Sequence, residues 1–187
     1  SYRSDLTILV REIKTMTDKL LTGPSRDPAS GNAAKQLVVF LHGRGANGDD
    51  LIGLAPILAE QFPDAAFLSP DAPLTLDGYP SALQWFDSSN RDPEYMAAGV
   101  RAAAPAIDDF LDHHLDRLGL ENENLAIFGF SQGCRMALHV GLRRKTCPAA
   151  LLGFSGSLAA PEALAAEITV KPPVLLVHGD ADDIVPY

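Results

Sequence analysis

The sequence of 187 residues lacks the features that mark several large classes of protein. It has only two cysteines, Cys134 and Cys147, and a helical segment between them would hold them roughly 20 Å apart. That is too far for a disulfide, and two free thiols indicate a reducing compartment, so we expect the cytoplasm. No apolar run approaches the ~18 residues of a membrane-spanning helix. The first residues also lack the apolar core of a secretory signal.

Positive charge is scarce as well: 15 lysines and arginines stand against 24 acidic residues, a net charge of −9. A nucleic-acid partner is therefore not expected, because such proteins present a basic face. The basic run Arg143-Arg144-Lys145 falls at the end of a predicted helix, where cations offset the helix dipole. Hydrophobic residues make up 47% of the chain, which is enough for one sizeable core in one domain.

The chain divides into a short beginning and one domain. Residues 1–15 look unlike the rest of the chain, and Met16 is a plausible native start. We therefore expect residues 1–15 to be a non-native or leader segment and residues 16–187 to form a single domain. Within that domain, residues 22–35 have the composition of turns and loops.

Strand and helix patterns then alternate along the domain. Short apolar runs predict strands at residues 37–41, 65–69, 125–128, 150–154 and 174–177. Helical spacing predicts helices at residues 49–62 with a break near Pro56, 92–118 with a kink at Pro105, and 132–145. A long irregular segment covers residues 70–92. This alternation predicts an α/β fold, with a mostly parallel, doubly wound sheet and helices on both faces.

The most informative motif is Gly129-Phe130-Ser131-Gln132-Gly133, which lies between a predicted strand and a predicted helix. In this G-x-S-x-G pattern a sharp turn exposes the serine, and the glycines avoid clashes where the turn packs. The helix start directs free N–H groups and the positive end of the dipole to the same place. We therefore expect Ser131 to be a nucleophile. The similar stretch 153–157 lacks the second glycine and is interpreted as a strand end with its turn.

A catalytic serine needs an orienting acid and donors for the oxyanion. The acid is expected beyond a later strand, where Asp180, Asp182 and Asp183 are the candidates. The expected oxyanion donors are the backbone N–H groups of Gln132 and Arg44, the latter in the glycine-rich loop after the first core strand. His42, at the end of that strand, is expected to be structural.

Four segments together carry a resemblance: residues 41–45, 84–87, 129–133 and 178–186. From Leu37 to its end, the chain resembles the small carboxylesterase/phospholipase family of α/β-hydrolases, which includes acyl-protein thioesterases and lysophospholipases. The resemblance implies that Asp182 is the triad acid. It also implies hydrolysis of carboxylic esters or thioesters through an acyl-serine, without a metal or organic cofactor. The loop at 70–92 is expected to form the acyl-side wall with Leu74, Leu76, Trp85 and Phe86.

One departure concerns the catalytic histidine, which the family carries well beyond the acid, whereas this chain ends at Tyr187. Of its five histidines, His178 is the least unsuitable substitute. We expect the domain to lack its final strand and helix, with the triad histidine beyond Tyr187. Residues 174–177 would then form an apolar edge strand that favours aggregation or a homodimer. The alternative is a non-catalytic relative that binds a ligand or partner in an inherited pocket; a dienelactone-hydrolase activity is less favoured, because those enzymes use cysteine.

Overall fold

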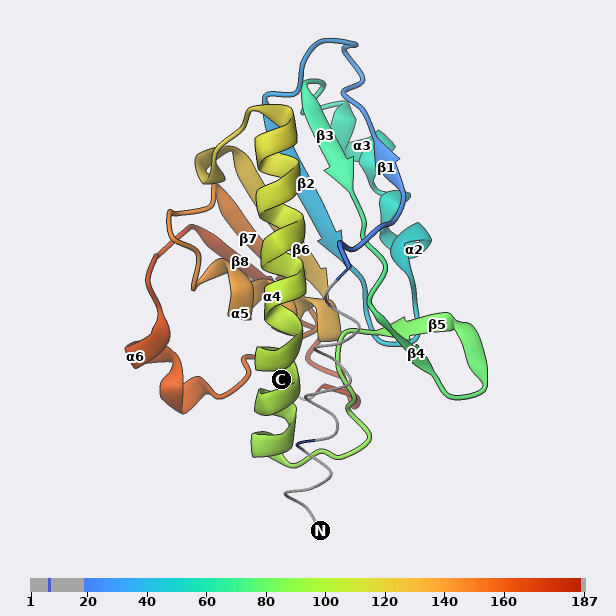
Figure 1. Ribbon diagram of the computed structural model, residues 1–187, viewed down its shortest axis with the longest axis vertical. Helices are drawn as coiled ribbons and strands as arrows, with labels where there is room; N and C mark the ends of the chain where they lie inside the picture. The colour runs from blue at the N-terminus through green and yellow to red at the C-terminus, as the bar shows by residue number, and fades with distance from the viewer. Residues whose placement is uncertain (1–6, 8–18, 186–187) are drawn as a thin grey trace.

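The computed structural model of the protein describes Thr7 and residues 19–185 (Figure 1). The segment 1–15 that the sequence sets apart lies outside the described residues except for Thr7, so its origin stays a prediction. Among the helices of the described part, none is long and apolar enough to cross a membrane.

A six-stranded sheet forms the centre of the molecule, in the order β1-β3-β2-β6-β7-β8. Only the pairing of β1 with β3 is antiparallel; the other four pairings are parallel. The strands are β1 (Ser25–Arg26), β2 (Gln36–Leu41), β3 (Ala65–Leu68), β6 (Leu125–Phe130), β7 (Ala150–Phe154) and β8 (Val174–Val177). The mostly parallel sheet predicted from the sequence is confirmed, including all five predicted strands.

Helices cover both faces of this sheet. They are α2 (Gly48–Ile52), α3 (Ala55–Ala59), α4 (Pro93–Leu118), α5 (Gln132–Gly141) and α6 (Leu164–Glu167), with 3₁₀ turns η1 (Asn122–Asn124) and η2 (Pro161–Ala163). Side chains alternate along a strand, so β2 sends Leu37 and Val39 into a core with α4 and α5, and Phe40 into a second core with α2 and α3. Figure 1 shows α4 lying across one face, with α2 and α3 beyond the sheet.

The helices differ from expectation in two places. Residues 49–62 form two short helices, because Pro56, in the first turn of α3, has no N–H to continue the preceding helix. The third predicted helix ends at Gly141 instead of Lys145. α4, in contrast, has the predicted ends: Asp92 caps the N–H groups of its first turn, and Gly119 closes it at φ 66°. It runs through Pro105 as one helix.

The segment at 70–92 is not irregular throughout, because it contains the antiparallel hairpin of β4 (Leu74–Leu76) and β5 (Tyr79–Gln84). The turn is Asp77-Gly78, with Gly78 at φ 79°. An Asp-Gly pair between two apolar stretches is a recognised hairpin signal, and it could have revealed this element in the sequence. The hairpin projects from the body of the molecule beside the end of β2 (Figure 1).

The far edge of the sheet is β8, which pairs only with β7 in the described part of the chain. Its four side chains, Val174 to Val177, are between 44% and 63% exposed. The expected apolar edge strand is therefore present.

Candidate active site

Ser131 occupies the sharp turn between β6 and α5. Its backbone has φ 53° and ψ −113°, a conformation that residues with a side chain rarely adopt. The turn is fixed by two backbone hydrogen bonds: the Ser131 N–H donates to the Phe154 carbonyl at 2.8 Å, and the Arg135 N–H donates to the Ser131 carbonyl at 3.2 Å. The side chain is half-buried at the carboxyl end of the parallel strands, where ligands of open α/β sheets bind.

The two glycines of the motif are required by close packing. A Cβ atom on Gly133 would lie 1.9 Å from the Leu41 carbonyl oxygen, and one on Gly129 would lie 2.3 Å from the Gly133 carbonyl oxygen. Real contacts of Cβ atoms are never this short, so a side chain at either position would push α5 away from β2 and β6. The glycines therefore allow the helix to begin directly against the sheet, which is what holds Ser131 in its turn.

The loop after β2 lies against this turn. A Cβ atom on Gly43 would be 3.5 Å from the Cβ of Ser131 and 3.0 Å from the Phe130 ring. The backbone N–H groups of Arg44 and Gln132 form no hydrogen bond with any described residue. That of Gln132 belongs to the first turn of α5, whose N–H groups have no partner within the helix. Both groups are thus available to a ligand beside Ser131.

The side chain of Gln132 binds the backbone of the 85–86 segment. Its Oε1 accepts a hydrogen bond from the Trp85 N–H at 2.7 Å, and its Nε2 donates to the Phe86 carbonyl at 2.9 Å. The Trp85 indole donates to the His42 carbonyl at 2.8 Å. The Trp85 and Phe86 side chains are fully buried. The expectation that they line the acyl wall is therefore corrected: they lie in the core, where they attach the loop to the nucleophile turn.

His42 is structural, as expected. Its Nε2 accepts the Ala72 N–H at 3.0 Å, which places the ring hydrogen on Nδ1, 2.8 Å from the Gly43 carbonyl. Burial lowers the pKa of His42, although the Gly43 carbonyl and nearby carboxylates oppose this. With both nitrogens engaged, the neutral ring holds two loops together.

The loop after β8 holds one of its three aspartates in place. Oδ1 of Asp182 accepts hydrogen bonds from the Val185 N–H at 2.9 Å and the Ile184 N–H at 3.0 Å, whereas Asp180 and Asp183 are exposed. The Val185 bond, with smaller contributions from Ile184 and His178, lowers the pKa of Asp182 despite partial desolvation. Asp182 is therefore the one of the three candidates whose carboxylate is held by backbone hydrogen bonds, and it is ionised at neutral pH.

The sheet brings the two loops to one edge. Phe130, Phe154 and Val177 lie side by side in register on β6, β7 and β8, so Ser131 and the acid loop both follow strands that end at the same level. His178 lies beside Asp182, with its Nε2 3.5 Å from Oδ2, but the same nitrogen also contacts the Val185 carbonyl at 2.6 Å.

None of the five histidines, all of which lie within the described residues, forms a hydrogen bond with Ser131. Both ring nitrogens of His42 are engaged by the loops that it joins. His139 is buried in α5, where burial lowers its pKa to about 4, and its Nδ1 has no hydrogen-bond partner among the residues that the structure describes. His113 and His114 lie on α4. His178 contacts the acid loop instead.

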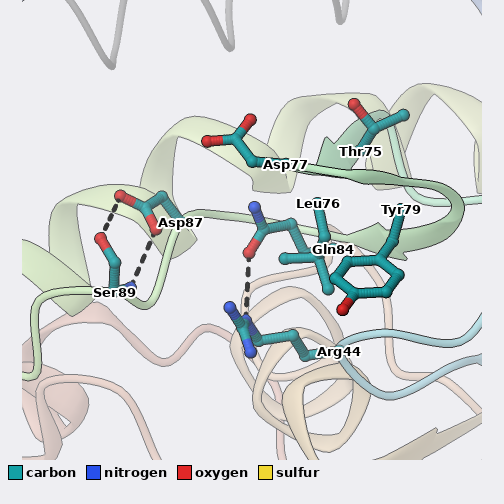
Figure 2. Close-up of a pocket in the computed structure, with 8 residues that line it drawn as sticks. All are labelled: Arg44, Thr75, Leu76, Asp77, Tyr79, Gln84, Asp87 and Ser89. Carbon is teal, nitrogen blue, oxygen red and sulfur yellow. Dashed lines mark hydrogen bonds between the residues drawn. The ribbon is translucent and has the colours of Figure 1, made fainter.

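A cavity of about 430 Å³ opens beside Arg44, between the loop after β2 and the β4–β5 hairpin (Figure 2). The residues that line it are Arg44, Thr75, Leu76, Asp77, Tyr79, Gln84, Asp87 and Ser89. All but Leu76 carry a polar group, and Leu74 is not among them. Sequence reasoning expected an apolar wall here and missed this polar cavity, because it did not predict the hairpin that forms its wall.

Known proteins resemble this chain in sequence and in fold. The sequence pattern of the phospholipase/carboxylesterase family matches residues 28–187. The chain belongs to this family. Acyl-protein thioesterase 1 of Saccharomyces cerevisiae is 31% identical over 166 residues, which cover 82% of this chain and 73% of the yeast protein. Acyl-protein thioesterase 1 of Schizosaccharomyces pombe is 30% identical, covering 80% and 69%. The crystal structure of esterase PE8 is 45% identical, with a TM-score of 0.85, covering 90% of this chain and 79% of that one.

Membership of the phospholipase/carboxylesterase family confirms the resemblance that the sequence motifs indicated, and it confirms the α/β-hydrolase fold. It also makes the protein a hydrolase of the carboxylesterase and thioesterase type.

Proposed function

We propose that the protein is a serine carboxylic-ester hydrolase that acts through an acyl intermediate on Ser131. The observation that carries this proposal is the strained turn at the start of α5. It holds a half-buried serine next to two backbone N–H groups, of Arg44 and Gln132, that have no partner in the described chain. Such an arrangement suits a reaction in which negative charge develops on a carbonyl oxygen.

In the proposed reaction, Ser131 Oγ attacks the acyl carbon and its proton passes to a base. The N–H groups of Arg44 and Gln132 stabilise the charge on the carbonyl oxygen. The bond to the leaving alcohol or thiol then breaks, the proton from the base goes to the leaving group, and an acyl-serine remains. Water adds to this ester and releases the acid. Asp182, ionised in its loop, orients the base.

The base is a histidine, and none of the five described histidines supplies it at Ser131. We propose that a longer form of the chain, closer in length to its relatives, carries it; this form is called the longer product below. The 187-residue polypeptide and that longer product should then differ in activity by several orders of magnitude. The oxyanion donors and binding alone give only ~10³–10⁴-fold over water in a related triad enzyme. Equal activities would contradict this part of the proposal.

The proposed substrates are small acyl esters or thioesters. The relatives called acyl-protein thioesterase 1 support the thioester class, and esterase PE8 supports the ester class. The cytoplasm is the proposed compartment, because Cys134 and Cys147 are both free thiols, as suits a reducing environment.

A fluorophosphonate probe, which reacts with activated serines, tests the nucleophile. Ser155 provides a matched control, since it follows the neighbouring strand β7 and also has a positive φ, of 49°. We expect the Ser155→Ala variant of the longer product to be labelled like the parent and the Ser131→Ala variant to remain unlabelled. Peptide mapping of the labelled protein should place the adduct on Ser131. Labelling of Ser131→Ala at the parental rate would reject the assignment.

A second function, that of a non-catalytic relative with a ligand pocket, is favoured by one observation: no histidine contacts Ser131 in the described residues. If the longer product neither reacts with the probe nor hydrolyses esters, yet still binds a ligand in the cavity beside Arg44, this second function is the correct one.

A further inference from the structure

The cavity beside Arg44 is unsuited to an acyl chain. Only Leu76 offers a purely apolar side chain to it, whereas an alkyl chain would remove charged and amide groups from water without giving them new partners. The cavity nevertheless has the volume of a small-molecule site, within the usual range of about 300–1,000 Å³. Its occupant should therefore be polar.

The charged groups of the cavity restrict the occupant further. One guanidinium, from Arg44, and two carboxyl groups, from Asp77 and Asp87, line the cavity. Burial alone would raise the pKa of Asp87. Hydrogen bonds from Ser89 and Tyr95, together with the charge of Arg44, outweigh this effect, so the pKa of Asp87 is lowered. The lining holds two carboxyl groups and one guanidinium, so an anionic ligand is disfavoured. The guanidinium of Arg44 offsets part of the attraction that the two carboxyl groups exert on a cation, so the cavity is not a strong cation site either.

The hydrogen-bonding groups favour a ligand that can both donate and accept. Arg44 Nε donates to Gln84 Oε1 at 3.3 Å, and the guanidinium makes no other hydrogen bond with described residues, so its remaining N–H groups can donate to a ligand (Figure 2). Asp77, exposed at the hairpin turn, can accept from one. Thr75 adds a hydroxyl that does either. Alcohol groups are uncharged, and each can both donate and accept, so they meet all three demands.

Arg44 also fixes the position of such a ligand. Its backbone N–H is a proposed oxyanion donor, while its side chain forms part of the cavity wall. A ligand group that contacts the side chain therefore lies within the reach of one arginine side chain from the proposed oxyanion donor. We propose that the cavity binds the leaving-alcohol part of the substrate, and that this part is an uncharged polyol such as glycerol or a sugar. This inference rests on the proposed function.

Kinetics with two esters of the same acid test the inference. We compare 1-butyrylglycerol with propyl butyrate, which lacks the two free hydroxyls, using the longer product. The parent should prefer the glycerol ester in kcat/KM. In Asp77→Leu this preference should fall about tenfold, and in Thr75→Val by a smaller factor. The matched control is Asp109→Leu, which removes an exposed carboxylate on α4 away from the cavity; it should keep the parental preference.

A binding measurement is independent of turnover. The non-hydrolysable ether 3-butoxypropane-1,2-diol should shift the side-chain N–H resonances of Arg44 and Gln84 in ¹H–¹⁵N spectra, whereas butyl propyl ether should not. The Asp77→Leu variant should weaken the diol at least fivefold. Shifts with both ethers or with neither would overturn the polyol site, even if ester hydrolysis at Ser131 is confirmed. Shifts with the diol alone, without hydrolysis, would support the site and reject the proposed reaction.

Discussion

Replacing Gln132 with Met should destabilise the protein without removing any backbone donor. Methionine keeps the length of the side chain but cannot form the two hydrogen bonds that glutamine makes with the 85–86 segment. The Trp85 N–H and the Phe86 carbonyl would both lose their partner. Both residues are fully buried, so water cannot easily replace the lost bonds.

The expected size follows from these two groups. A buried donor or acceptor left without a partner costs about 1–3 kcal/mol, so two of them cost about 2–6 kcal/mol. That is a large fraction of the 5–15 kcal/mol by which a domain is usually stable. Relaxation of the loop would bring the cost toward the lower end. The loop carries the polar cavity, so its relaxation should also lower kcat/KM.

Urea unfolding, followed by circular dichroism, measures the effect. The control is Gln61→Met, at an exposed glutamine outside the cores, which should change the free energy of unfolding by less than about 0.5 kcal/mol. If Gln132→Met is as stable as this control, with an unchanged m-value, the glutamine does not hold the loop and the reasoning is wrong.

Two further predictions concern pH and self-association. The pKa of His139 falls to about 4 through burial and Arg143, so the unfolded chain takes up the proton near pH 6.5 while the folded one does not; stability should drop by about 2 kcal/mol from pH 7 to pH 5. In urea titrations, the His139→Leu variant should lose about 2 kcal/mol less stability between pH 7 and pH 5 than the parent does. A loss equal to that of the parent would contradict the assignment. The β8 edge should make the 187-residue polypeptide self-associate as a homodimer or larger species, and Leu176→Lys should reduce this in light scattering; an unchanged mass would reject β8 as the contact.

The sequence was most informative where local chemistry decides the structure. The β6 turn was recognisable because glycine is needed at Gly129 and Gly133 for contacts that a Cβ would prevent. The ends of α4 were recognisable because Asp92 and Gly119 each perform a local capping function. In such cases a few neighbouring residues carry the whole signal.

The polar cavity was not predictable in the same way, because its walls come from separate segments. Trp85 and Phe86 have the composition of an apolar binding wall. However, Gln132, 46 and more residues further along the chain, binds their backbone and helps to fix them in the core. Their burial leaves Arg44, Asp77 and Asp87 to face the cavity. No local pattern indicates which side of a loop faces inward when a distant hydrogen bond decides it.

The two loops of the proposed active site, which carry Ser131 and Asp182, are held by different amounts of packing. Ser131 follows β6, which lies between β2 and β7 in the middle of the sheet, and its turn is packed tightly by glycines. Asp182 follows β8, whose side chains are largely exposed and whose described partner is β7 alone. Local opening requires less free energy where few apolar contacts are lost. The acid loop should therefore lose its geometry before the nucleophile turn does.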